Sequence, residues 1–182
     1  MKNTIKSILR FYKSVFYRYL PVKSTDHSTE TVLNHIGYND TFSSSGQPTK
    51  RQFSLIRKEG YDVVINLAPY DRIEIPLKDE EAIVTALGMS YVHIPVNMFN
   101  PTQEDFNAFV ETMMGASGKK IWVHCAVGMR ASAFLYKYRC TVLGENRQDA
   151  IWDLREVWEP FGAWKAFLYG ETATPQTQSR GV

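Results

Sequence analysis

The sequence predicts an α/β domain with a central, mainly parallel sheet flanked by helices. Short apolar segments rich in β-branched residues alternate with helical segments of roughly 10–13 residues, which is the order expected of βαβ units. The chain has 182 residues, of which 44% are hydrophobic. This length is sufficient for one domain with a substantial core and too short for two full-sized domains.

Three strands are predicted where apolar residues follow one another and β-branched residues are frequent. They lie at 62–67 (DVVINL), 91–96 (YVHIPV) and 121–125 (IWVHC). In parallel sheets ligands bind beyond the carboxyl ends of the strands. The end of the third strand is therefore where we look for chemistry.

Six helices are predicted from capping and stop signals. Thr49 can cap the first helix, and Gly60 ends it. Gly88 stops the second, Thr102 opens the third and Gly118 breaks it. The predicted helices span 50–59, 78–87, 103–114, 130–142, 147–158 and 161–168.

The basic charge of the chain is concentrated at its N-terminus. Residues 1–25 carry six lysines and arginines and no acid, and the remaining 15 basic and 19 acidic residues leave the rest at −4. Apolar residues at steps of three and four predict a basic amphipathic helix over 2–20, which either contacts an anionic membrane or covers a flank of the domain. The domain is expected to span 26–170, followed by a disordered tail at 171–182.

Composition excludes several classes of protein. The near-neutral body gives no reason to expect nucleic-acid binding. No run approaches the roughly 18 apolar residues of a membrane span. Two cysteines are too few for a disulfide scaffold, which favours a cytoplasmic location. The four histidines lack the spacing of metal ligands, so no metal site is expected.

The clearest chemical signal is the segment 123–132 (VHCAVGMRAS), which joins the third strand to a helix. Cys125 stands where the free N–H groups and the dipole of the helix favour a thiolate and an anion. Gly128 lets the loop wrap an anion, and Arg130 can hold two of its oxygens. Ser132 can donate to the thiolate, and His124 can hydrogen-bond the loop from behind.

This loop resembles the signature loop of the cysteine-dependent phosphatases, in particular the small bacterial dual-specificity-phosphatase-like domains of the protein tyrosine phosphatase family. The resemblance covers residues 41–140, because SSSGQPT (43–49), GYDVVINL (60–67), LGMSYVHIPV (87–96) and NPTQEDF (100–106) follow in the order of those domains. It implies a cysteine-phosphatase-like fold and hydrolysis of phosphomonoesters through a phosphocysteine, with no metal or organic cofactor.

The resemblance also assigns roles to residues. Cys125 matches the nucleophile, Arg130 the phosphate-binding arginine and Ser132 the hydroxyl near the thiolate. The backbone that matches the phosphate-binding loop belongs to Ala126, Val127, Gly128, Met129 and Arg130.

Two features depart from the family pattern. Arg130 follows Cys125 after four intervening residues, where most of the superfamily has five. The loop after 94–96 (IPV) also lacks the aspartate that acts as general acid, so activity is expected to be weak with poor leaving groups. That loop instead contains Asn97, Met98 and Phe99. The nearest carboxylates are Glu104 and Asp105, and Asp71, on the loop after the first strand, is another candidate.

Two other functions fit the same loop. A six-residue loop from cysteine to arginine is typical of rhodanese-like sulfurtransferases, in which Cys125 would carry a persulfide. A pseudophosphatase would bind a phosphorylated partner without turnover, which agrees with the missing acid. The GQPT and IPV segments favour the phosphatase.

Overall fold

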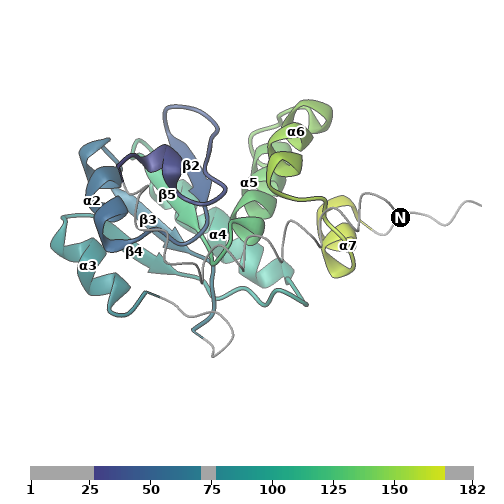
Figure 1. Cartoon of the computed structure of the whole chain (residues 1–182). Helices are drawn as coiled ribbons and strands as arrows, with labels where there is room; N and C mark the ends of the chain where they lie inside the picture. Colours follow the sequence, from purple (N-terminus) through teal and green to yellow (C-terminus); the bar gives the residue numbers. More distant parts are fainter. Residues whose placement is uncertain (1–26, 71–76, 171–182) are drawn as a thin grey trace, which may run out of the picture.

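The protein contains a five-stranded sheet with helices on both faces (Figure 1). The structure is a computed structural model that describes residues 27–70 and 77–170. The strand order is β1-β2-β5-β3-β4, and every pairing is parallel except that of β1 with β2. The predicted α/β fold with a mainly parallel sheet is therefore confirmed. The helix predicted at 2–20 and the tail predicted at 171–182 lie outside the described residues.

The three predicted strands are present as β3 (Val63–Asn66), β4 (Ser90–His93) and β5 (Ile121–His124). β5 lies between β2 and β3, and all four of its residues are buried. Its last residue is in register with the last residues of both neighbours, Ser45 and Asn66. The loop after β5 therefore begins in the interior of the sheet, at the edge where three parallel strands end together.

Two strands are not predicted from the sequence: β2 (Phe42–Ser45) and its short partner β1 (Ile36–Gly37). Beyond its phenylalanine, β2 lacks the β-branched and aromatic residues that are frequent in strands. All four residues of β2 are nevertheless buried, because each serine hydroxyl has a hydrogen-bond partner. Ser43 pairs with the Tyr61 hydroxyl (2.5 Å), Ser44 with the Tyr38 hydroxyl (2.9 Å), and Ser45 accepts from Trp122 Nε1 (2.9 Å).

Every predicted helix is present, with ends within two residues of those predicted. In the first, the side chains of Thr49 and Gln52 form a reciprocal capping box. A 3-10 turn, η1 (Thr29–Thr31), precedes β1. The helices are α2 (Lys50–Lys58), α3 (Glu80–Ala86), α4 (Gln103–Gly115), α5 (Met129–Thr141), α6 (Arg147–Val157) and α7 (Ala163–Tyr169).

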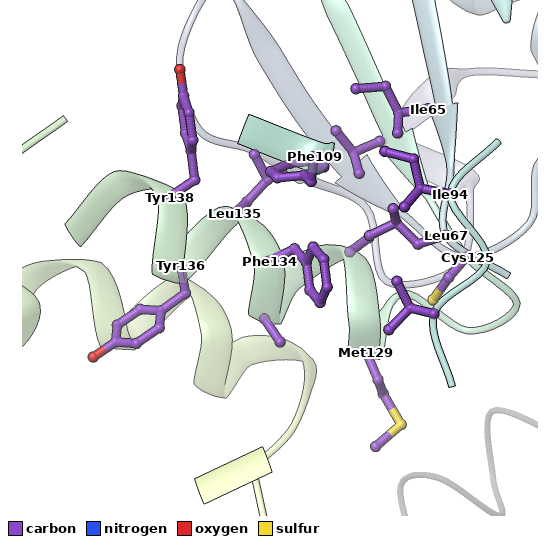
Figure 2. Packing of buried hydrophobic residues seen from close by; sticks show 14 of the residues in the cluster. Ile65, Leu67, Ile94, Phe109, Cys125, Met129, Phe134, Leu135, Tyr136 and Tyr138 are labelled. Atoms are coloured by element: carbon purple, nitrogen blue, oxygen red, sulfur yellow. The ribbon is translucent and has the colours of Figure 1, made fainter. Parts of the chain in front are cut away.

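Two apolar clusters fix the helices to the sheet. On one face α4, α5, α6 and α7 enclose a core in which Phe134 packs edge-on against Phe109, with ring centroids 5.5 Å apart (Figure 2). On the other face Phe53 and Trp122 belong to a second cluster that includes residues of α2 and α3. The first half of α5 is buried throughout, so the helix that follows the cysteine loop is held firmly. No helix in the described part of the chain is long and apolar enough to cross a membrane.

Candidate active site

The cysteine loop lies between β5 and α5, as the sequence predicts. Cys125 directly follows β5 and is fully buried, and Gly128 is the N-cap of α5. The Gly128 N–H donates to Cys125 Sγ at a distance of 3.1 Å. The sulfur thus lies at the N-terminus of a 13-residue helix, where the helix dipole favours negative charge.

Two peptide groups of the loop point their N–H groups inward. The Val127 carbonyl accepts from Asn34 Nδ2 (2.8 Å), and the Ala126 carbonyl accepts from the Gln47 N–H (3.1 Å). In a trans peptide the C=O and the following N–H point in opposite directions. The N–H groups of Val127 and Gly128 therefore point away from these carbonyl partners, and that of Gly128 contacts the sulfur. Successive N–H groups of this kind form an anion-binding nest.

Only glycine fits at position 128. Its φ is +86°, a left-handed conformation that other residues adopt at a cost. A Cβ built there would lie 3.2 Å from the Gly46 nitrogen, the Ser45 carbonyl carbon and the Asn34 Cβ. Two of these neighbours are backbone atoms of the segment that pairs with the loop through a Gly46–Val127 bridge. The predicted role of Gly128 in shaping the loop thus has a steric basis.

Arg130 lies in the first turn of α5 and is 2% exposed. Its Nη1 donates to the Val96 carbonyl (2.9 Å), at the start of the loop that follows β4. The arginine therefore connects the cysteine loop to the loop after β4, which contains residues 94–96 (IPV). It does so although only four residues separate it from Cys125. Its role in holding phosphate oxygens stays a prediction.

The two supporting residues make contacts other than those expected. The Ser132 hydroxyl donates to the Met129 carbonyl (3.0 Å), and its predicted donation to the thiolate stays a prediction. His124 is fully buried behind the loop, and its Nε2 lies 3.0 Å from Glu80 Oε1. The contact with a carboxylate on α3 is not predicted from the sequence.

Of the three candidate general acids, Glu104 and Asp105 differ in exposure and in hydrogen bonding. Asp105 completes the capping box of α4, where its Oδ2 accepts from the Thr102 N–H (3.2 Å). Glu104 is exposed in the same first turn, and Asp71 lies outside the described residues. Asn97, at the start of the loop after β4, accepts from the Phe99 N–H through Oδ1 (2.8 Å). The capping role of Asp105 makes it a poor proton donor for a leaving group.

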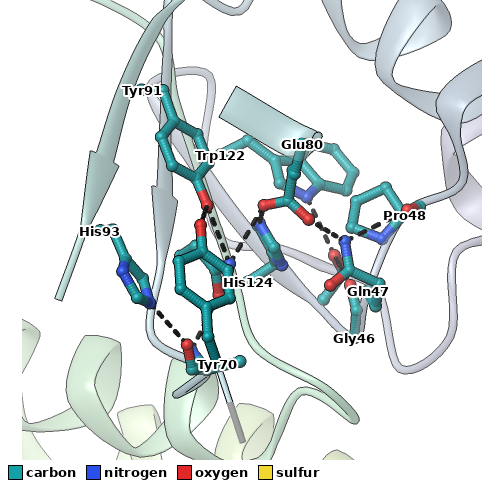
Figure 3. Close-up of polar contacts among 12 residues, drawn as sticks. Gly46, Gln47, Pro48, Tyr70, Glu80, Tyr91, His93, Trp122 and His124 are labelled. Carbon is teal, nitrogen blue, oxygen red and sulfur yellow. Dashed lines mark hydrogen bonds and ion pairs between the residues drawn. The ribbon is translucent and has the colours of Figure 1, made fainter. Parts of the chain in front are cut away.

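A polar network centred on Glu80 lies beside the loop and is not predicted from the sequence (Figure 3). The Glu80 carboxylate accepts from Gln47 Nε2 and from Asn66 Nδ2 (3.1 Å). Burial raises the pKa of Glu80, but the charge and hydrogen bond of His124 and the hydrogen bonds from Gln47 and Tyr91 outweigh it, so the pKa lies below its ordinary value. Glu80 is one of three consecutive acids at 79–81, and nothing in the sequence distinguishes it from the other two.

Comparisons with known proteins agree with this geometry. A model of the family "DSP-PTPase phosphatase fused to NAD+ Kinase" matches residues 13–160. A beta-lactamase hydrolase-like protein of Agrobacterium fabrum is 32% identical over 155 residues, which cover 82% of this chain and 33% of that protein. A similar protein of Xylella fastidiosa is 30% identical over 118 residues, covering 64% of this chain and 27% of that protein. The chain thus spans about a third or less of the length of these curated relatives.

Solved structures share the fold. A DUF442 protein of Shewanella putrefaciens has a TM-score of 0.70 and 35% identity, with 82% of this chain and 94% of that chain covered. TpbA of Pseudomonas aeruginosa, solved in complex with phosphotyrosine, has a TM-score of 0.58 at 15% identity, with 74% and 80% covered, and supports the fold alone. The matched family model, together with these structures, confirms the resemblance seen in the sequence. The chain belongs to the DSP-PTPase family, and its domain is a cysteine-dependent phosphatase of the protein tyrosine and dual-specificity type.

Proposed function

We propose that this chain hydrolyses phosphomonoesters with Cys125 as the nucleophile. The observation that carries the proposal is the 3.1 Å hydrogen bond from the Gly128 N–H to Cys125 Sγ, within a loop whose Ala126 and Val127 carbonyls are held by Gln47 and Asn34. Preorganised donors of this kind stabilise charge on a thiolate and on the oxygens of a transferred phosphoryl group. Arg130, in the first turn of α5, supplies a further positive charge to those oxygens.

The reaction has two steps. In the first, the Cys125 thiolate attacks phosphorus, the S–P bond forms, and the bond from phosphorus to the ester oxygen breaks. The leaving oxygen takes its proton from water, because the loop after β4 carries Asn97, Met98 and Phe99 where related enzymes have an acid. In the second step water attacks the phosphocysteine, the S–P bond breaks, and inorganic phosphate and the thiolate are released.

The lack of an acid at 97–99 in the loop after β4 bears on the substrate. Loss of general acid catalysis costs about 10²–10⁴-fold with poor leaving groups and less with good ones. Aryl phosphates have the better leaving groups, and the structural neighbour TpbA was solved with phosphotyrosine. We therefore propose phosphorylated phenols, such as phosphotyrosine, as substrates that this site turns over more readily than alkyl phosphates.

The test is the hydrolysis of para-nitrophenyl phosphate across about pH 5–8 by the full chain. We expect activity in the wild type and none in Cys125→Ser. The matched control is Cys140→Ser, since Cys140 is the other cysteine of the chain and lies near the end of α5. Its activity is expected to equal that of the wild type, and activity retained in Cys125→Ser would refute the mechanism.

An inactive wild type would favour one of the other functions of the loop. Transfer of sulfur from thiosulfate to cyanide would identify a sulfurtransferase, and binding of vanadate without turnover would identify a pseudophosphatase. The cytoplasmic location and a contact of residues 2–20 with anionic membranes stay predictions from the sequence alone. Co-sedimentation of the full chain with anionic and with neutral vesicles tests the membrane contact.

A further inference from the structure

Glu80 is a fully buried carboxylate that the proposed reaction does not use. It lies at the start of α3, and its side chain has no exposed surface. The groups around it come from the carboxyl ends of three parallel strands, because His124 ends β5, Asn66 ends β3 and Gln47 follows β2. Figure 3 shows Glu80 facing His124 and Gln47. A buried charge is retained only where hydrogen bonds or an opposite charge compensate for lost hydration. This carboxylate has hydrogen bonds from Gln47 and Asn66 and a close contact with His124.

The two oxygens of Glu80 are linked to the two residues that flank the nucleophile, to His124 directly and to Ala126 through Gln47. Oε1 lies 3.0 Å from Nε2 of His124, the residue before Cys125. Oε2 accepts from the side chain of Gln47, and the Gln47 backbone N–H donates to the carbonyl of Ala126, the residue after Cys125 (3.1 Å). The second path sets the direction of the Ala126–Val127 peptide group, next to the peptide whose Gly128 N–H donates to the sulfur.

We propose that Glu80 is a positioning residue for the phosphatase reaction, holding Cys125 and the anion-binding N–H groups in place through His124 on one side and Gln47 on the other. The inference rests on the proposed function of the loop. A carboxylate suits this position because each of its oxygens accepts from an amide, Oε1 from Asn66 Nδ2 and Oε2 from Gln47 Nε2. A glutamine at position 80 would turn an NH₂ group toward one of these two amide donors, so that one donor faces another.

The experiment compares Glu80→Gln with Glu81→Gln in the full chain. Glu81 is the exposed neighbour in the same first turn of α3, so its substitution removes the same charge from the same helix end. We measure kcat and KM with para-nitrophenyl phosphate, and the inhibition constant of vanadate, well below the melting temperature of each variant. The melting temperature is recorded separately.

Misplacement of a reacting group by about 1 Å costs up to about 10²-fold. We therefore expect Glu80→Gln to lower kcat by about 10–10²-fold and to weaken vanadate inhibition, and Glu81→Gln to behave as the wild type. A folded Glu80→Gln with the kcat and vanadate inhibition of the wild type, and only a lower melting temperature, would overturn the inference. If Glu80→Gln does not fold, Glu80→Asp replaces it, because aspartate retains the charge but is too short to reach both partners. An unchanged kcat in Glu80→Asp would also overturn the inference.

The outcome is separable from that of the proposed function. A wild type that does not hydrolyse para-nitrophenyl phosphate refutes the proposed function. A wild type that is active, with Glu80 variants equal to it, refutes only the positioning role.

Discussion

Gly128→Ala is the substitution whose effect the structure specifies most closely. Gly128 has a φ of +86°, and its N–H donates to Cys125 Sγ. An added Cβ would lie 3.2 Å from the nitrogen of Gly46 and the carbonyl carbon of Ser45, which belong to the backbone and cannot rotate away. Either the loop or the segment beside it must shift, and the N–H group that contacts the sulfur shifts with it.

The chain offers a matched control. Gly60 has the same φ of +86°, and a Cβ built there meets nothing within 4 Å. Gly60→Ala therefore incurs only the cost of the left-handed conformation, about 1–2 kcal/mol. The effect of alanine on the unfolded chain is the same in both variants, so the difference between them isolates the close contacts.

We expect Gly60→Ala to lower the melting temperature by about 2–8 °C and to leave kcat/KM unchanged. Gly128→Ala should lower the melting temperature further and reduce kcat/KM by about 10²-fold or more, the cost of losing one preorganised donor. Thermal unfolding and para-nitrophenyl phosphate hydrolysis measure the two effects. Equal melting temperatures for the two variants, with wild-type activity in both, would refute the steric reasoning.

Two further predictions concern stability. Phe134→Ala should lower the free energy of unfolding in urea by about 3–5 kcal/mol, because Phe134 is fully buried against Phe106 and Phe109. Phe99→Ala, at a side chain that is 85% exposed, should lower it by less than about 0.5 kcal/mol. Similar losses in the two variants would contradict the assigned core. The pKa of Glu80 is lowered in the folded protein, so its ionised form stabilises the fold at pH values above 4.5, the ordinary pKa of a glutamate. This stabilisation is lost as the pH falls through the folded-state pKa. The difference in melting temperature between wild type and Glu80→Gln should therefore shrink from about pH 7 to about pH 3, and a constant difference would show that the charge contributes nothing.

Local signals account for the elements that the sequence predicts correctly. The starts of α2 and α4, at Thr49 and Thr102, are encoded within four residues, because a capping box needs only the N-cap residue and the third residue after it. The strand before Cys125 is recognisable because a strand buried on both faces is apolar throughout. β2 was not predicted because its serines are accommodated by hydroxyl and indole groups on distant segments, such as Tyr61 and Trp122.

The same distinction applies to the site. The strand–loop–helix that carries Cys125, Gly128 and Arg130 is predictable from the sequence, because these residues lie within six positions and their chemistry follows from one helix N-terminus. The contacts that hold this loop are visible only in the folded structure. Asn34 lies 93 positions before the carbonyl it donates to, and Gln47 lies 33 positions before the carboxylate of Glu80. Contacts over such separations depend on which strand ends lie side by side, and strand order is set by packing of the whole sheet rather than by any local pattern.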